Sequence, residues 1–315
     1  MAPSVWAIVL NYNGARDTSE CLASLLSSDY PSLKLLLVDN GSAEQAWKII
    51  PTGMPSVEVL DNGANLGYAE GNNRGIRLAF ERGADYALVL NNDTVVVPDM
   101  VTRLVAAAER HPKAAMIAPL ITFYDEPDRI DSCGTEMDWL RLRPRPALHG
   151  RPVAEAPAGP TAMQIVPGSA ILLRRDWCAR HGLFDEELFL IHEDADLCLR
   201  NRAAGGENLL APDAVARHKR SRTLSSYPYL TQYYTARNFL YLAVRRAAPG
   251  EKVLAAVGFV FYFLRTLGGR CFASGRARTE CAGALAGIVD FMRGRKGPCP
   301  RTEPPAGSAA QTGPR

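Results

Sequence analysis

Four short apolar runs in the N-terminal part of the chain each end in polar side chains, and this pattern limits the folds that the chain can adopt. The runs are 5–10, 33–38, 57–60 and 86–90. Consecutive apolar residues over this length are typical of strands buried on both faces, as in the parallel sheets of α/β proteins. Helical apolar spacing lies between several of them, and each strand–helix–strand step predicts a right-handed parallel crossover. We therefore predict an open α/β sheet whose strands end at one common edge.

The polar residues that follow these runs mark the predicted binding edge, because ligands of open α/β sheets bind outside the carboxyl ends of the strands. The best-marked group is Asn91-Asn92-Asp93, which directly follows the run 86–90. Its carboxylate, Asp93, offers a hard oxygen ligand to Mg²⁺ or Mn²⁺, although such a triplet is also ordinary turn chemistry. The residues that we expect to converge at this edge are Asn11, Asp39, Asn65, Asn91 and Asp93.

Further strands are predicted beyond Asp93. Two lie at 116–120 and 164–173, and a third at 209–217 reads as an edge strand because Pro212 interrupts it. Between the first two, the stretch 124–161 is rich in Pro, Arg and Gly. We expect it to form a long irregular excursion over the active face, without regular elements.

The C-terminal part is predicted to be helical and basic. Lys and Arg outnumber Asp and Glu from Arg245 onward, which suits an anionic membrane surface or an anionic acceptor. The most apolar run there, 253–264, stops at Arg265 and is too short to span a bilayer, so it fits either a packed or an interfacial helix. Residues 295–315 have little to bury and are expected to be disordered. The expected helices are 229–246, 251–267 and 278–292.

Composition indicates the class of protein but says little about its binding partners. The hydrophobic share of 47% and the charged share of 22% are those of an ordinary globular protein, and a net charge of +3 indicates no nucleic-acid partner. The seven cysteines contain no Cys-x-x-Cys pair, which favours reduced thiols. The N-terminus enters a strand without the pattern of a signal peptide. We expect a cytoplasmic protein with peripheral association at the inner face of the cell membrane.

The ordered motifs resemble the inverting, nucleotide-diphosphosugar-dependent glycosyltransferases of family 2, in particular their bacterial rhamnosyltransferase-like branch. The resemblance covers roughly 5–238, and each motif is weak alone while their order and spacing together are strong. The motifs are Leu10-Asn11-Tyr12-Asn13-Gly14, Val38-Asp39-Asn40-Gly41-Ser42, the run 65–75, Asn91-Asn92-Asp93-Thr94, Gly168-Ser169-Ala170, Phe184-Asp185-Glu186, the run 193–200 and His218.

The resemblance implies the GT-A fold of the α/β class, a Rossmann-like, mixed and mostly parallel sheet flanked by helices, with a C-terminal helical extension. It places a GT-A domain at 1–225, with a nucleotide-sugar half at 1–123 and an acceptor and catalytic half at 124–225. A helical region that could contact a membrane follows at 226–294, and the expected tail occupies 295–315.

The resemblance also implies roles for individual residues. Asp39 would accept from the nucleobase edge, with the backbone near Tyr12 packed on the base. Asp93 and His218 would ligate a divalent cation, Mg²⁺ or Mn²⁺. Asp194 would be the catalytic base, with Glu193 as the second candidate. One departure is that Asn91 stands where the family has its nominal first Asp. The implied nucleotide-sugar-binding set is Asn11, Tyr12, Asn13, Asp39, Asn65, Gly67, Gly71, Asn72, Asn91, Asn92 and Arg237.

Several of these residues have a plain structural alternative. Glu193, Asp194 and Asp196 could all cap a helix, and Asp196, about 200° around it from Asp194, can only be an ion-pair or capping residue. The glycines at 67, 71 and 75 either let a backbone approach phosphate or give clearance for packing. Arg237 faces either a diphosphate, an acceptor phosphate or solvent.

These inferences together predict transfer of a sugar from a dTDP- or UDP-sugar, such as dTDP-rhamnose, to a hydroxyl of a cell-envelope or lipid-linked glycan. One carboxylate base without a second nucleophilic carboxylate predicts inversion. Two alternatives stay open: a nucleotide-sugar-binding module without turnover, and a sugar-1-phosphate nucleotidyltransferase. The second lacks the basic Gly-rich loop expected after the first strand, because Asn11-Tyr12-Asn13-Gly14 is uncharged.

Overall fold

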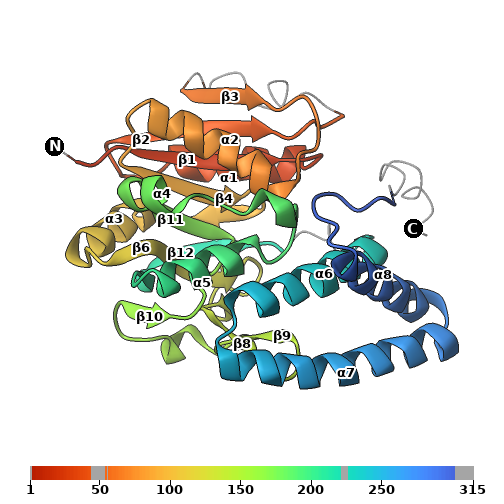
Figure 1. Ribbon diagram of the computed structural model, residues 1–315. Helices are drawn as coiled ribbons and strands as arrows, with labels where there is room; N and C mark the ends of the chain where they lie inside the picture. Colours follow the sequence, from red (N-terminus) through yellow and green to blue (C-terminus); the bar gives the residue numbers. More distant parts are fainter. Residues whose placement is uncertain (1, 44–53, 55, 221–225, 302–315) are drawn as a thin grey trace.

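A mixed sheet forms the centre of the computed structural model, which describes residues 2–43, 54, 56–220 and 226–301 (Figure 1). Within these residues the sheet has ten strands, ordered β10-β12-β6-β11-β4-β1-β2-β3, with β5 paired to β12 and β7 to β6. The strands are β1 (Val5–Asn11), β2 (Leu33–Asp39), β3 (Val57–Asp61), β4 (Tyr86–Asn91), β5 (Thr94–Val96), β6 (Ala114–Phe123), β7 (Ile130–Ser132), β10 (Thr161–Met163), β11 (Ala170–Arg174) and β12 (Glu207–His218).

The four predicted N-terminal strands are confirmed and run parallel. β1 pairs with β2 and β4, and β2 pairs with β3. In this register Asn11 lies beside Asp39, and Leu10 lies beside Asn91. The polar residues that end these strands therefore meet at one edge of the sheet, as their sequence pattern predicts.

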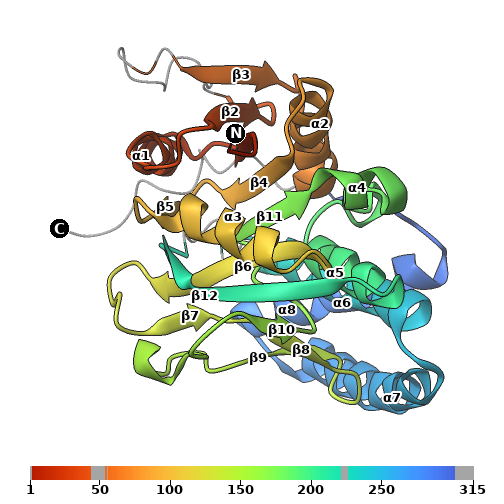
Figure 2. The ribbon, with the colours of Figure 1, turned by 90° about the vertical axis from the view of Figure 1, so that its left-hand side faces the viewer.

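Helices cover both faces of the sheet because each central strand alternates its side chains between two cores. Trp6 and Ile8 of β1 belong to one core, and Val5 and Ala7 belong to the other. Figure 2 shows α1 on one side of the sheet and α2 and α4 on the other. The helices are α1 (Ala15–Leu26), α2 (Gly67–Glu81), α3 (Met100–Arg110), α4 (Arg175–His181) and α5 (Glu193–Ala203).

The stretch 124–161 is more regular than expected. It contains β7 and a separate hairpin of β8 (Thr135–Asp138) and β9 (Arg143–Pro146). Met137, Trp139 and Leu142 anchor this hairpin in the main core. The expectation of an irregular excursion was wrong because an outer hairpin strand such as β9 tolerates proline, and because a few buried apolar residues are enough to fix it.

β12 is not the edge strand that Pro212 suggested. It lies between β10 and β6, parallel to β6. Its register with β6 shifts between Ala211 and Val215, so Pro212 sits in a bulge where no regular ladder bond is required. This placement carries the end of the strand, His218, to the edge where β4 and β5 meet.

The three C-terminal helices are confirmed as α6 (Pro228–Arg246), α7 (Pro249–Phe272) and α8 (Gly275–Met292). α8 lies against α6, where Gly283 approaches the backbone of Tyr229 so closely that a Cβ would have no room. α7 runs along the lower side of the molecule, away from the sheet (Figure 1). α7 is also longer than the apolar run 253–264 suggested. Among the described residues it alone has, over Pro249–Gly269, the length and mean hydropathy (1.4) of a membrane-crossing helix, although only 17% of that window is buried.

The segment just after α8 departs from the expected disordered tail. Gly297 N donates to the carbonyl of Glu187, and Cys299 N donates to the hydroxyl of Tyr234. Residues 295–301 are therefore tied to the rest of the protein by backbone hydrogen bonds. Residues 302–315 lie outside the described part of the chain.

Candidate active site

The loops after β1 and β2 are fixed by a buried polar network. Asn11 Nδ2 donates to Asp39 Oδ1 at 2.9 Å, and Ser42 N donates to Asp39 Oδ2 at 3.0 Å. Asn13 Oδ1 accepts from Ala43 N at 2.9 Å, which joins the two loops. Asp39 is thus oriented at the edge by its neighbours, while Tyr12, the residue that follows Asn11, is 44% exposed.

The start of α2 carries the predicted residues 65–72. Asn65 Oδ1 accepts from Gly67 N at 3.0 Å, which shapes the turn into the helix. Asn72 is fully buried, and its Nδ2 donates to Tyr68 O at 2.9 Å. These contacts assign both asparagines a structural task at the edge of the site. Their implied contacts with the nucleotide-sugar remain predictions.

The evenly spaced glycines of α2 are explained by packing. A Cβ at Gly71 would lie 2.9 Å from a methyl carbon of Leu10, and a Cβ at Gly75 would lie 2.8 Å from one of Ile8. Gly67 has φ +81°, and a Cβ there would lie 2.5 Å from the carbonyl oxygen of Phe189. Close approach of α2 to β1 and to the Phe189 segment accounts for all three positions.

Asn91 and Asn92 have different partners. Asn91 Oδ1 accepts from the hydroxyl of Tyr68 at 3.0 Å, on the helix that starts at the site. Asn92 Nδ2 donates to Thr18 Oγ1 at 3.0 Å and so ties the end of β4 to α1. The hydroxyl partner therefore accounts for the orientation of Asn91, the residue that stands at the family's nominal Asp position.

Asp93 and His218, far apart in sequence, meet because β5 pairs with the end of β12 and sets His218 beside Thr94. His218 Nε2 lies 3.2 Å from Asp93 Oδ1, and its Nδ1 lies 2.8 Å from Asp131 Oδ2. Burial lowers the pKa of His218, but hydrogen bonds with Asp131 and Asp93 outweigh it and raise the pKa to about 9.

Asp131, a buried residue of β7, is the functional candidate that sequence reasoning missed. It lies inside the stretch 124–161, where no motif marks it. Its only sequence signal is an acid flanked by an apolar residue, Ile130, in a stretch otherwise read as irregular. The pairing of β7 with β6, next to β12, is what brings it to His218.

The donor set at this point fits a divalent cation. Asp93 and His218 would hold the ion, and Asp131 would orient the imidazole through its other nitrogen, as carboxylates commonly do for metal-binding histidines. The described residues contain no group of three His, Cys, Asp or Glu side chains placed to hold a metal. The remaining ligands would therefore come from water and from phosphate oxygens of a substrate, the mode in which Mg²⁺ is usually bound.

Two of the acids that begin α5, Glu193 and Asp194, have raised pKa values. Glu193 is buried, and burial together with the charge of Asp194 raises its pKa. Burial also raises the pKa of Asp194, whose Oδ1 accepts from Ala195 N at 2.7 Å. Asp194 Oδ2 lies so close to Gly168 that a Cβ there would be 2.3 Å away, which requires glycine at 168.

Asp196 is an ion-pair residue, as predicted. It is 1% exposed, and its two oxygens bind Arg246 Nε at 2.6 Å and Arg200 Nε at 3.1 Å. Both of its oxygens are engaged in these ion pairs, so Asp196 fixes α5 to α6.

The hydroxyl of Tyr68 connects the two halves of the site. It donates to Asn91 Oδ1 at 3.0 Å and lies 3.3 Å from the carbonyl of Gly168, the residue that touches Asp194. Burial raises the pKa of Tyr68, and the negative charges of Glu193, Asp194 and Asp93 raise it further. The Tyr68 hydroxyl therefore links the end of β4, two residues before Asp93, to Gly168, which packs against Asp194 at the start of α5.

Arg237 is not where a phosphate contact would place it. It is fully buried, with Nη2 donating to Leu188 O at 3.0 Å and Nη1 donating to Gly297 O at 2.6 Å. The rings of Tyr233 and Tyr234 lie 5.2 and 5.1 Å from its guanidinium carbon. The guanidinium thus binds the protein's own backbone carbonyls, because the segment before α5 and the segment after α8 close around it.

Comparison with known proteins identifies the family. The model of glycosyl transferase family 2 matches residues 6–182, which is more than half of the chain and runs from the second residue of β1 to just past α4. The chain belongs to glycosyl transferase family 2. This glycosyltransferase is 28% identical over 267 residues to an N-acetylglucosaminyl-diphospho-decaprenol L-rhamnosyltransferase of Mycobacterium tuberculosis, covering 76% of this chain and 84% of the relative. It is 22% identical over 200 residues to the dTDP-rhamnosyl transferase RfbF of Shigella flexneri, covering 64% of each chain.

Solved structures agree on the fold. A mannosyltransferase from Pyrobaculum calidifontis in complex with GDP-Man and Mn²⁺ superposes with a TM-score of 0.60 at 18% identity, covering 93% of this chain and 88% of that one. S. aureus TarS 1–349 in complex with UDP-GlcNAc gives a TM-score of 0.58 at 15% identity, covering 92% and 81%. The glycosyltransferase thus has the predicted GT-A fold, and the nucleotidyltransferase and non-enzyme alternatives lose their support.

Proposed function

We propose that this glycosyltransferase moves a sugar from a dTDP- or UDP-sugar, such as dTDP-rhamnose, to a hydroxyl of a lipid-linked or cell-envelope glycan, with inversion and with a divalent cation. The names of the rhamnosyltransferase relatives support the donor and the acceptor class. The observation that carries the chemistry is the position of the Tyr68 hydroxyl, which binds Asn91, two residues before Asp93, and the carbonyl of Gly168, which packs against Asp194.

The transfer itself requires one base and one stabilised leaving group. The acceptor oxygen bonds to the anomeric carbon, its proton passes to Asp194, the bond from that carbon to the diphosphate oxygen breaks, and the nucleoside diphosphate leaves. A raised pKa makes Asp194 a better proton acceptor near neutral pH than an ordinary carboxylate. A cation held by Asp93 and His218 would supply stabilisation of the charge that develops on the diphosphate.

Inversion is supported by the different state of Glu193. Its burial and the charge of Asp194 raise its pKa, which favours the neutral acid. A buried ionised carboxylate would require hydrogen-bond partners for its oxygens. Oε2 of Glu193 has none among the described residues, which also favours the neutral acid. A neutral, buried Glu193 is unsuited to attack the sugar as a nucleophile. A single displacement assisted by Asp194 inverts the anomeric carbon.

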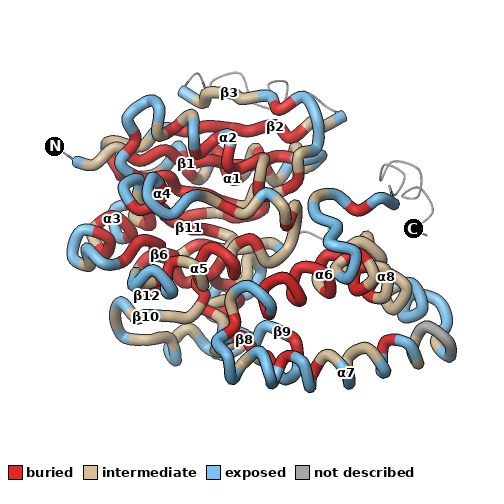
Figure 3. The backbone as a smooth tube through the Cα atoms, viewed as in Figure 1, coloured by how far each residue is buried: buried red, intermediate tan, exposed pale blue. Residues whose placement is uncertain are grey.

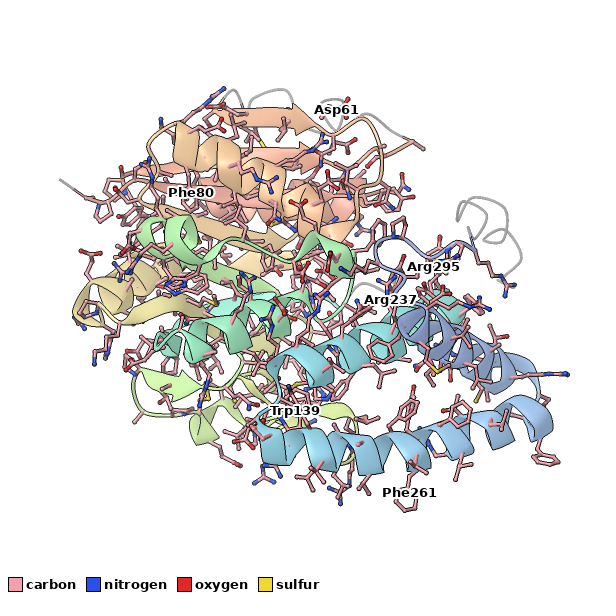
Figure 4. The ribbon with its side chains drawn as sticks, in the orientation of Figure 1. Asp61, Phe80, Trp139, Arg237, Phe261 and Arg295 are labelled. Carbon is pink, nitrogen blue, oxygen red and sulfur yellow. The ribbon has the colours of Figure 1, made fainter. Side chains whose placement is uncertain are left out.

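The surface of α7 supports peripheral binding at the inner face of the cell membrane. A stripe of apolar side chains at helical spacing lies open to solvent, with Phe261 69% exposed and pointing away from the body of the protein (Figure 4). The outer side of α7 is largely exposed along its length (Figure 3). The stripe consists of Val253, Leu254, Val257, Val260, Phe261 and Leu264.

Charge and packing favour an in-plane position for this helix over a spanning one. Lys252, Arg265 and Arg278 are exposed on or next to α7 and suit anionic lipid headgroups. The opposite side of α7 is occupied, since Ala255 is buried and a Cβ at Gly258 would lie 2.0 Å from the carbonyl of Leu140. A helix fixed to the protein on one side can lie on a membrane and bring the site to a lipid-linked acceptor.

A thermal-shift screen with UDP, dTDP and GDP, each with and without Mn²⁺, tests three things together: nucleotide binding, the preferred nucleobase and the dependence of binding on metal. We expect UDP or dTDP to raise the melting temperature, and Mn²⁺ to enlarge that shift in the wild-type chain and not in Asp93→Ala. Turnover is then measured as release of nucleoside diphosphate from the matching nucleotide sugar. Absence of a shift with all three nucleotides would contradict the proposed donor class.

A further inference from the structure

The segment that leads into α5 has an unusual backbone. Phe189, Ile191 and His192 have φ of +64°, +68° and +74°, three of the seven non-glycine residues with positive φ in the described part of the chain. Such conformations are unfavourable for side chains with a Cβ, most of all for a β-branched residue such as Ile191. They persist only where surrounding contacts over-determine the backbone. Glu193 and Asp194 follow directly, so this backbone decides where both acids point.

Asn238 of α6 supplies those contacts. It is fully buried, and its Nδ2 donates to the carbonyls of Leu188, Leu190 and Ile191 at 3.0, 2.7 and 2.8 Å. One amide group thus binds three backbone carbonyl oxygens within a run of four consecutive residues. A regular helix or strand cannot present its carbonyls to a single side chain in this way, so the contact selects the left-handed conformation.

Arg237 in turn orients Asn238. Its Nε donates to Asn238 Oδ1 at 2.9 Å, which fixes the amide so that Nδ2 faces the segment. Its Nη2 donates to Leu188 O, one of the oxygens that Asn238 also holds. The pair therefore acts as one unit on the side of α6 that faces the segment before α5.

The segment 188–192 is also bound by α2, on the side of the predicted nucleotide-sugar site. Phe189 O accepts from Tyr68 N at 2.7 Å, at the start of α2, and the Phe189 ring stacks on Tyr234 at 5.5 Å. The hydroxyl of the same Tyr68 reaches Asn91 at the end of β4. The backbone between Leu188 and His192 is thus fixed between α6 and α2, and it links the donor edge to the acids of α5.

We propose that Asn238 and Arg237 are positioning residues for catalysis, which hold the left-handed backbone at 189–192 and so aim Asp194 into the site. This proposal rests on the proposed role of Asp194 as the base. It predicts that loss of the Asn238 amide reduces the rate of the chemical step more than donor binding, because Asp39 and Asp93 lie on other elements.

The test compares Asn238→Ala, Arg237→Lys and Leu240→Ala. Leu240 is a buried residue of α6 that packs against α8, so Leu240→Ala reports on general loosening of the helix pair. The assays are kcat and KM for the nucleotide sugar found by the thermal-shift screen, and amide hydrogen exchange of peptides that cover 185–197. We expect kcat of Asn238→Ala to fall at least about a hundredfold with KM within about threefold of wild type, and its exchange at 188–194 to rise. Leu240→Ala should retain kcat.

A second substitution tests whether the backbone conformation is the cause. Glycine adopts positive φ without strain, so Ile191→Gly added to Asn238→Ala should restore at least tenfold of the lost kcat. Arg237→Lys keeps the charge and loses the Nε hydrogen bond, and its kcat should fall about tenfold. This variant tests the proposal if Asn238→Ala does not fold. A folded Asn238→Ala or Arg237→Lys with kcat within twofold of wild type, or a defect that Ile191→Gly does not relieve, overturns the proposal. Full activity of Asp194→Asn in the same assay would instead overturn the proposed base.

Discussion

Asp131 and His218 are joined by a bond of 2.8 Å between Oδ2 and Nδ1, which turns the opposite ring nitrogen of His218 toward Asp93. This bond assigns Asp131 a task that no motif suggested. Because Asp131 fixes the orientation of the imidazole through Nδ1, Nε2 and the Asp93 carboxylate lie 3.2 Å apart near the end of β4. The three residues come from β7, β12 and the loop after β4, so the pairing of strands in the sheet places them.

We predict that Asp131→Asn weakens Mn²⁺ binding about 10- to 100-fold, because removing a carboxylate behind a metal-binding histidine typically has this effect. The measurement is a titration of Mn²⁺ followed by electron paramagnetic resonance, in the presence of the nucleoside diphosphate that binds. Asp128→Asn is the matched control, since Asp128 is exposed three residues away. Equal Mn²⁺ affinity in the two variants would refute the orienting role of Asp131.

A second prediction separates the two carboxylates of the site. Asp93→Ala and Asp194→Asn should each reduce turnover by at least about 10²-fold, in keeping with the usual contribution of a general base or of a metal in group transfer. Only Asp93→Ala should lose the Mn²⁺-dependent thermal shift. Asp213→Asn, which changes an exposed carboxylate of β12, should leave both quantities unchanged. Wild-type turnover in either site variant would count against the proposed mechanism.

A third prediction concerns pH and the buried acid Glu193, whose pKa is raised by burial and by Asp194. Such a group is protonated in the folded chain at a pH where the unfolded chain has already ionised. Its contribution to stability is therefore complete below the ordinary carboxyl pKa and is lost as the pH rises toward the folded-state value, by up to about 1.4 kcal/mol per pH unit. Glu193→Gln cannot ionise and should not show this loss.

The measurement is denaturant unfolding of wild type and Glu193→Gln at pH 5 and pH 8. We expect the variant to gain free energy of unfolding relative to wild type between these two values. Glu126→Gln, a change at the surface, serves as the control. Parallel pH profiles for wild type and Glu193→Gln would show that Glu193 has no raised pKa in the folded protein.

The strands and their common edge could be predicted from sequence because they depend on local patterns. Apolar runs such as 86–90 specify buried strands, and right-handed crossovers leave no other arrangement for their ends. The approach of Asp93 to His218 followed from the family resemblance, and the register of β12 with β5 provides its structural basis. Asp196 could be assigned as an ion-pair residue from helix periodicity alone.

Long-range packing could not be predicted in the same way. Asp131 becomes significant only when β7 pairs with β6, and nothing local distinguishes it from other acids in 124–161. The burial of Arg237 could not be predicted, because an Arg on a helix surface and a buried Arg have the same local sequence pattern; a phosphate contact and a surface position therefore both stayed open. The positive φ of Ile191 is opposite to its local preference, so only the contacts of Asn238 from a distant helix explain it.

The last prediction concerns the apolar stripe of α7. Val257→Asp and Phe261→Asp each place a charge in the middle of the stripe, where a side chain would otherwise insert among lipid chains. Burial of one such apolar side chain contributes about 1.5–3 kcal/mol, so each variant should bind vesicles that contain phosphatidylglycerol at least about tenfold more weakly in a sedimentation assay. Val244→Asp is the matched control, because Val244 is 57% exposed and lies on α6. Raising the salt concentration should also weaken binding, since Lys252, Arg265 and Arg278 would face the headgroups. Equal vesicle binding by Val257→Asp, Phe261→Asp and Val244→Asp would show that α7 is not the membrane-facing surface, whatever the outcome of the catalytic tests.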